Sequence, residues 1–311
     1  MSEPALLTSA QVASFVARGF LRFEAAVPAD INAQFLAEAG QVAEPASGAK
    51  LGRVLGETLA ASDLPEVPAG TPLAEAYPSG SALGRLLDLP LVRGVIRSLL
   101  GEAPVFDHHF LHVTLPPRFH EAAEHENVSQ HTHQDSTIDP RQQAFDVQMM
   151  YYPHAVTRPM GGTRFIPGTH LRKVSEVAVG RYQNIVGQQH VVCEAGTLLF
   201  LHHGVWHGGG VNLSDDARYM FKIRMHASGS QVRGWNLEDL PKRNAQRPIF
   251  FVKSAPAKGT VETILTTPEP WFEQDTGRLE YINRIKLWRY LTDDPSYDAD
   301  YWLTRLEHQA S

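Results

Sequence analysis

The sequence predicts a mainly β protein with flanking α-helices, whose core is an antiparallel barrel or a jelly roll. Two observations lead to this class. Helical apolar patterns dominate residues 1–103. From about residue 104 they give way to short apolar runs bounded by Gly, Pro or polar turns. Several short strands that follow a helical region favour antiparallel sheets that pack or close on themselves.

One domain over residues 1–311 is expected, because no internal repeat, low-complexity tract or obvious linker divides the chain. A chain of 311 residues is long enough to bury a large core in this way. The expected parts are a helical N-terminal region over about 1–103, a strand-rich core over about 104–228, and a C-terminal extension of strands and helices over 229–311.

Capping residues and apolar periodicity set the expected elements of the N-terminal region. In chain order they are a helix from Thr8 or Ser9 to Gly19, a short strand over 19–23, a second helix after Pro28, an irregular or partly helical stretch over 44–80, and a helix over 83–100 that ends at Gly101. The strands expected next span 105–115, 145–153, 191–193, 197–201 and 217–227. Two further helices, over 277–290 and 298–308, are expected to pack outside the sheets.

Composition narrows the functional classes. The net charge of −6 and a pI near 6.2 disfavour nucleic acid and anionic membranes as partners. Cys193 is the only cysteine, which excludes a disulfide framework or a Cys-rich zinc site within one chain. The N-terminus lacks the pattern of a secretory signal, and no window approaches the roughly 20 apolar residues of a membrane span. The cytoplasm is therefore the expected location.

The most informative pattern is His133-Gln134-Asp135 followed, far along the chain, by His207. In a strand, His133 and Asp135 would share one face, because successive side chains alternate. Two histidines and one carboxylate on one side of a metal leave positions open for small molecules, as in non-haem Fe(II) oxygenases. His202 and His203 are rival third ligands. Gly208 to Gly210 would let the backbone approach a bound metal or ligand.

The run over 217–227 divides by parity into an apolar face and a cationic one. The apolar face carries Tyr219, Phe221, Ile223 and Met225, and the other face carries Arg218, Met220, Lys222 and Arg224. A solvated charged face is the ordinary interpretation, but the interior of a small barrel is an alternative location. There the Arg218 guanidinium could clamp a carboxylate through two parallel hydrogen bonds. The roles of Lys222 and Arg224 stay open.

Gln148 poses a similar question in the run over 145–152, where it shares a face with Asp146, Met150 and Tyr152. A buried amide needs a hydrogen-bond partner. A metal-bound keto acid and a structural network are equally suitable partners.

These residues resemble the phytanoyl-CoA dioxygenase family of Fe(II)/2-oxoglutarate oxygenases. The resemblance is carried by the His-Gln-Asp triplet, by the Gly-rich turn at 161–170 that ends in Pro-Gly-Thr-His, by the strand and turn over 195–207, and by Asn212, Ser214 and Arg218 at the family's spacing. It covers about residues 105–227 and extends more weakly to the N-terminus. Thr132 departs from the pattern, since an aromatic residue often stands there.

The resemblance implies a double-stranded β-helix (jelly-roll or cupin-like) core with flanking helices. It implies Fe(II) held by His133, Asp135 and His207, and 2-oxoglutarate paired with Arg218, with Gln148 and Thr163 as further co-substrate contacts. The expected reaction consumes O2 and yields succinate and CO2. Related halogenases lack the metal-binding carboxylate, so the presence of Asp135 favours hydroxylation or desaturation.

Two other functions fit the same residues. A zinc hydrolase could use the His/Asp/His set to activate a water molecule and would have no need of Arg218. A non-catalytic cupin-like protein could bind a metal or a small acid without turnover. The primary substrate and the oligomeric state are not readable from the sequence.

Overall fold

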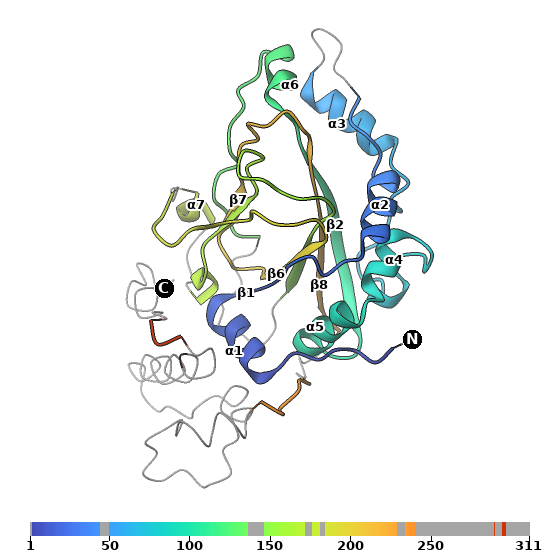
Figure 1. Cartoon of the computed structure of the whole chain (residues 1–311), viewed down its shortest axis with the longest axis vertical. Helices are drawn as coiled ribbons and strands as arrows, with labels where there is room; N and C mark the ends of the chain where they lie inside the picture. Colours follow the sequence, from blue (N-terminus) through green and yellow to red (C-terminus); the bar gives the residue numbers. More distant parts are fainter. Residues whose placement is uncertain are drawn as a thin grey trace.

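A computed structural model describes residues 2–43, 50–135, 146–171, 176–180, 184–228, 234–239, 289 and 294–296. The helices expected at 277–290 and 298–308 lie outside these residues, apart from Arg289. Two antiparallel sheets form the centre of the described part, with helices along one side of the larger sheet (Figure 1). The mainly β class with flanking helices is confirmed, and the two sheets are separate rather than one closed barrel.

The larger sheet has the strand order β1-β6-β3-β8-β2, and the smaller sheet has the order β5-β4-β7. The strands are β1 (Phe20–Phe23), β2 (Pro104–Thr114), β3 (Val147–Tyr152), β4 (Thr163–Phe165), β5 (Gln189–His190), β6 (Thr197–His202), β7 (His207–Gly209) and β8 (Arg218–Ala227). The helices are α1 (Ser9–Arg18), α2 (Ala29–Glu38), α3 (Leu51–Ala60), α4 (Ala82–Leu87), α5 (Pro90–Leu100), α6 (Pro117–Ala122) and α7 (Glu176–Val179), with short 3-10 turns at Leu73–Glu75 and Thr169–Leu171.

Helix α1 begins and ends where its capping residues predict. The Thr8 hydroxyl accepts a hydrogen bond from the Gln11 backbone N–H, and the Gln11 side chain accepts one from the Thr8 N–H. Gly19 ends the helix in the left-handed conformation, with φ at +79°. A Cβ there would lie 2.5 Å from both His170 Nδ1 and Val205 Cγ2, so the close approach also requires glycine.

The single helix expected over 83–100 is wrong, because the chain forms α4 and α5 instead. Leu89, between them, is extended (φ −59°, ψ 134°), and Pro90 occupies the first turn of α5. Proline disfavours a helical conformation at the residue before it and has no N–H to donate back along a helix. The helical periodicity is shared by both segments and hides this break.

The strand expected at 191–193 is also wrong. The chain pairs with β4 only at Gln189–His190, and then changes partner so that Cys193 forms an isolated bridge with Val156. That change of partner prevents a continuous ladder. Strands β4 and β7 and helix α6 were not predicted, since runs of three to six residues hold too little periodicity.

The two faces of the larger sheet have different surroundings. Its outer face packs against the helices through Phe221, Ile223 and Met225 on β8. Its inner face packs against the smaller sheet, with Met150, Leu199 and Met220 in that second core. The predicted apolar face of the 217–227 run therefore lies against the helices, and its cationic face lies between the two sheets. Within the described part of the chain, no helix is long and apolar enough to cross a membrane.

Candidate metal centre

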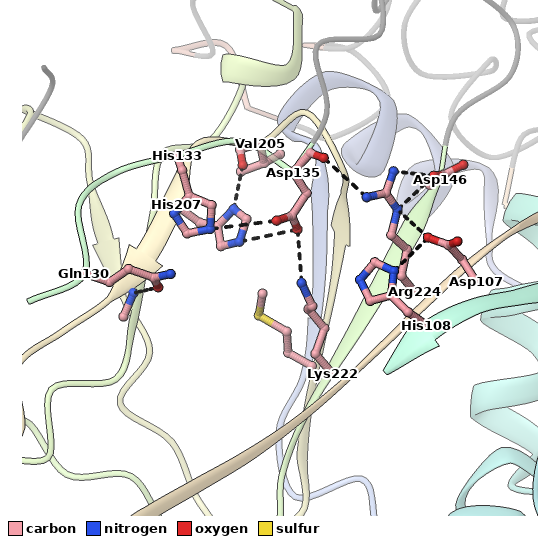
Figure 2. Close-up of polar contacts among 12 residues, drawn as sticks. Asp107, His108, Gln130, His133, Asp135, Asp146, Val205, His207, Lys222 and Arg224 are labelled. Carbon is pink, nitrogen blue, oxygen red and sulfur yellow. Dashed lines mark hydrogen bonds and ion pairs between the residues drawn. The ribbon is translucent and has the colours of Figure 1, made fainter. Parts of the chain in front are cut away.

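His133, Asp135 and His207 come together between the two sheets (Figure 2). His207 begins β7, and His133 lies opposite it in an isolated bridge. Each of the two residues donates its backbone N–H to the other's carbonyl, at 2.8 Å in both directions. The Asp135 N–H donates to the His203 carbonyl at 3.3 Å. Backbone hydrogen bonds thus hold all three residues in place.

The three side chains offer ligand atoms within 4.8 Å of one another. Asp135 Oδ1 lies 3.8 Å from His133 Nε2, and Asp135 Oδ2 lies 3.7 Å from His207 Nε2. Both distances are too long for hydrogen bonds. They leave room for a cation between the carboxylate and the two rings. Dashed lines in Figure 2 mark these two contacts.

The hydrogen bonds of the two rings fix which nitrogen is free. Nδ1 of His133 lies 3.1 Å from the His131 carbonyl, and Nδ1 of His207 lies 2.9 Å from the Val205 carbonyl. A carbonyl only accepts hydrogen bonds, so each Nδ1 carries the proton and each Nε2 presents a lone pair in the neutral ring. Two lone pairs and a carboxylate converge on one point, an arrangement that suits a divalent cation.

The charge states agree with this arrangement. Burial lowers the pKa of His207 to about 4, so this ring is neutral at pH 7. Burial alone would raise the pKa of the Asp135 carboxyl, but His207 and Lys222 beside it hold that pKa below its ordinary value. Asp135 is therefore a carboxylate at pH 7.

The rival ligands His202 and His203 lie outside this cluster of ligand atoms. His202 Nδ1 accepts a hydrogen bond from the Gly204 N–H at 3.0 Å. His203 Nδ1 accepts one from the Asp146 N–H at 2.9 Å. Both rings thus shape the turn between β6 and β7.

Gly208 and Gly210 allow close approach of other backbone segments of the same chain rather than of the three candidate ligands. A Cβ at Gly208 would lie 2.9 Å from the His131 carbonyl oxygen, and one at Gly210 would lie 2.6 Å from the Gly161 carbonyl oxygen. Gly208 lets the segment before His133 lie directly against β7, where Gln130 Oε1 accepts from the Gly209 N–H at 3.0 Å, and Gly210 lets the backbone pass close to Gly161.

Arg218 is buried at the start of β8, only 4% exposed. Its guanidinium donates to the carbonyl oxygens of Met160 (2.8 Å) and Gly161 and to the Thr114 hydroxyl (2.7 Å). All of these acceptors are neutral. A buried cation without a carboxylate partner suits the binding of an anion.

Arg224, at the other end of the same face, has anionic partners. Its Nε donates to Asp146 Oδ2 at 2.8 Å and lies 3.4 Å from Asp107 Oδ2. Its Nη1 also donates to the backbone carbonyl of Asp135 at 3.3 Å. Lys222 lies between the two arginines, with Nζ 3.4 Å from Asp135 Oδ2 (Figure 2).

The two lesser co-substrate candidates are both buried. Gln148 lies close enough to Asp135 to lower the pKa of that carboxyl, yet neither Oε1 nor Nε2 has a hydrogen-bond partner within 3.5 Å in the part of the chain that the structure describes. The Thr163 hydroxyl accepts a hydrogen bond from the Tyr152 hydroxyl at 2.8 Å.

His112 is a site residue that the sequence did not single out. It lies opposite Met220 on β2, and burial lowers its pKa to about 4, with Lys222 and His207 nearby as lesser causes. It is one of seven histidines from His108 to His133, and their density alone does not distinguish a site residue from the others. The alternation of His108, Phe110 and His112 on one strand face was the signal that could have placed it.

The model of the family described as Phytanoyl-CoA dioxygenase (PhyH) matches residues 15–220. EctD from S. alaskensis, in its apo form, is 18% identical over 75% of this chain and 81% of its own, with a TM-score of 0.52. The non-heme monooxygenase ThoJ, also apo, is 20% identical over 73% and 85%, with a TM-score of 0.49. HygX from Streptomyces hygroscopicus, with nickel and 2-oxoglutarate bound, is 16% identical over 75% and 92%, with a TM-score of 0.48. No curated protein sequence matches the chain. The family match and the likeness to EctD assign the two sheets to the jelly-roll, or double-stranded β-helix, fold.

Proposed function

The chain belongs to the phytanoyl-CoA dioxygenase family of non-haem Fe(II)/2-oxoglutarate-dependent oxygenases, and we propose that it hydroxylates an unactivated C–H bond of a small-molecule metabolite. The family uses Fe(II), 2-oxoglutarate and O2. The observation that carries the proposal is the convergence of His133, Asp135 and His207, which bring two Nε2 lone pairs and a carboxylate together. The buried Arg218, which donates to neutral acceptors, supports it. The finer reaction, hydroxylation, rests on the presence of the Asp135 carboxylate.

The chain's own residues would hold iron through His133 Nε2, Asp135 and His207 Nε2. Iron, when bound, supplies the oxidative chemistry that couples decarboxylation of 2-oxoglutarate, to succinate and CO2, with oxidation of the substrate. The protein's share is positioning and electrostatics. The His131 and Val205 carbonyls keep the proton on Nδ1 of each ring, so Nε2 stays free and oriented.

Arg218 would bind the distal carboxylate of 2-oxoglutarate. Its three neutral acceptors fix the guanidinium in position without neutralising it. Gln148 and Thr163 would complete the co-substrate site, Gln148 with an amide that has no partner of its own and Thr163 with a hydroxyl already oriented by Tyr152. Burial excludes water from these contacts and strengthens them.

The test is succinate formation by the purified protein with Fe(II), 2-oxoglutarate, ascorbate and O2, combined with a screen of metabolites for stimulated turnover. Iron-dependent succinate, and a product heavier than its substrate by one oxygen atom, are expected. Arg218→Ala should lose most of this activity, whereas the matched Arg97→Ala, at a surface ion pair with Glu102, should keep it.

A zinc hydrolase would release its product without O2 or 2-oxoglutarate, and a binding protein would show no turnover. Either result across the screen would overturn the proposal. A product that lacks two hydrogen atoms, rather than gaining oxygen, would keep the oxygenase class and replace hydroxylation by desaturation.

A further inference from the structure

Lys222 is a buried cation whose role the metal centre does not explain. Lys222 is 7% exposed. Among the described residues its only hydrogen-bond or ion-pair partner is Asp135, whose Oδ2 lies 3.4 Å from Lys222 Nζ, a long contact. Its Nζ also lies 5.3 Å from the centre of the Phe110 ring. A buried ammonium is costly unless an anion or several acceptors compensate it.

The two arginines on the same strand face are already accounted for. Arg224 has Asp146 and Asp107, and Arg218 faces the proposed position of the 2-oxoglutarate distal carboxylate. Asp135 cannot serve Lys222 fully, because a metal ion at the triad would share the charge of that carboxylate. Lys222 is therefore the under-compensated cation of the three.

The other carboxylates on this side of the sheet lie at Arg224 rather than at Lys222. Asp107 and Asp146 together carry one negative charge more than Arg224 neutralises, but among the described residues neither of them pairs with Lys222. An anionic group beside Lys222 would compensate this cation locally.

Phe110 provides an apolar surface beside this cation. It lies opposite Lys222 in the pairing of β2 with β8, and β2 is the edge strand of the larger sheet. The residue is 53% exposed, so its ring is accessible from solvent. The rings of His108 and His112 flank it, with centroids at 5.0 Å and 5.9 Å.

We propose that Lys222 and Phe110 form the subsite for the primary substrate, and that this substrate carries a carboxylate joined to an apolar body. The carboxylate pairs with Lys222, and the apolar body lies on the Phe110 ring, open to solvent at the sheet edge. This inference rests on the proposed function and narrows its substrate class.

The test measures, by calorimetry, the binding of paired probes to the anaerobic enzyme loaded with Fe(II) and 2-oxoglutarate. The probes are benzoate, 3-phenylpropanoate and hexanoate, each beside its neutral primary amide. At least one acid should bind the wild type more tightly than its amide by at least about tenfold, as expected for a buried charge-assisted pair. Lys222→Met should abolish that preference and Lys222→Arg should restore most of it. Lys50→Met, an exposed lysine at the start of α3, is the matched control and should keep it.

The affinity for 2-oxoglutarate, read from the visible absorption of its anaerobic Fe(II) complex, separates the two anions. It should change less than about twofold in Lys222→Met, because Arg218 holds the co-substrate. A parallel loss of 2-oxoglutarate affinity would overturn the inference and assign Lys222 to the co-substrate. So would a panel in which no acid binds better than its amide. Absence of the Fe(II)·2-oxoglutarate absorption in the wild type would instead overturn the proposed function.

Discussion

Arg218 and Arg224 occupy the two ends of one face of β8, and their partners differ completely. Among the described residues, Arg224 is bound by two carboxylates, whereas Arg218 is bound only by carbonyl and hydroxyl oxygens. The same residue type on the same strand face therefore supports two roles. A compensated guanidinium stabilises the fold, and an uncompensated buried one is available to an anion.

The largest expected effect is at Asp135, which contacts Lys222 and Arg224 on this strand face. Asp135→Ala should reduce turnover to the uncatalysed background, because the triad loses its only charged ligand. Bound iron, measured after purification with Fe(II), should fall in parallel. Turnover at the wild-type level would remove Asp135 from the metal site.

The next effect is the loss of co-substrate affinity in Arg218→Ala. The KM for 2-oxoglutarate should rise roughly 100-fold, as expected when a two-point charge-assisted contact is removed. In Arg224→Ala the KM should change far less. Steady-state succinate assays on both variants make the comparison, and equal increases in KM would erase the distinction between the two arginines.

Stability should respond in the opposite way. Arg224→Ala should lower the free energy of unfolding by about 2 kcal/mol, because Asp146 and Asp107 lose their partner while still partly exposed to water. Denaturant unfolding of the metal-free protein measures this. Asp146→Asn should give a similar loss, and a larger loss in Arg218→Ala than in Arg224→Ala would contradict the assignment.

The last effect, which develops only below about pH 6.5, concerns a buried base that lies in neither arginine's surroundings. Burial lowers the pKa of His170 to about 4, and its Nε2 donates to the Val16 carbonyl at 2.9 Å. In the unfolded chain the His170 ring binds a proton near pH 6.5, whereas in the folded chain it does so only near pH 4. Stability from this group is therefore complete above pH 6.5 and is lost as the pH falls toward 4.

His170→Gln keeps a donor for Val16 and removes the titration. The free energy of unfolding should then fall less steeply between pH 6.5 and pH 4, by about 1.4 kcal/mol per pH unit. Denaturant unfolding of wild type and variant at several pH values measures the slope. Identical slopes would show that His170 titrates normally in the folded protein.

The sequence was most informative where a pattern repeats or a cap is chemically specific. Parity separated the two faces of β8, and Thr8 with Gly19 set the bounds of α1. The sequence was least informative where a segment's structure depends on which distant segment it pairs with. The change of partner near Cys193 and the short strands β4 and β7 depend on contacts between distant segments, which local periodicity does not encode.

The same limit applies to the site. Residue types and order pointed to His133, Asp135, His207 and Arg218, and the fold brings the three candidate ligands together. The separate fates of Lys222 and Arg224 could not be inferred, because they depend on Asp107 and Asp146, which are far away in sequence. Which carboxylate neutralises which cation depends on the folded structure and not on the order of residues along the chain.

The reciprocal backbone bridge between His133 and His207 has a thermodynamic consequence. Both histidines belong to the smaller sheet's side of the site, while Asp135 is tied to the larger sheet through Lys222 and Arg224. An ion at the triad would thus fasten one sheet to the other, and its binding energy would count toward global folding. At a free metal concentration 100 times the Kd, this linkage adds about 2.7 kcal/mol to the resistance of the whole jelly roll to unfolding.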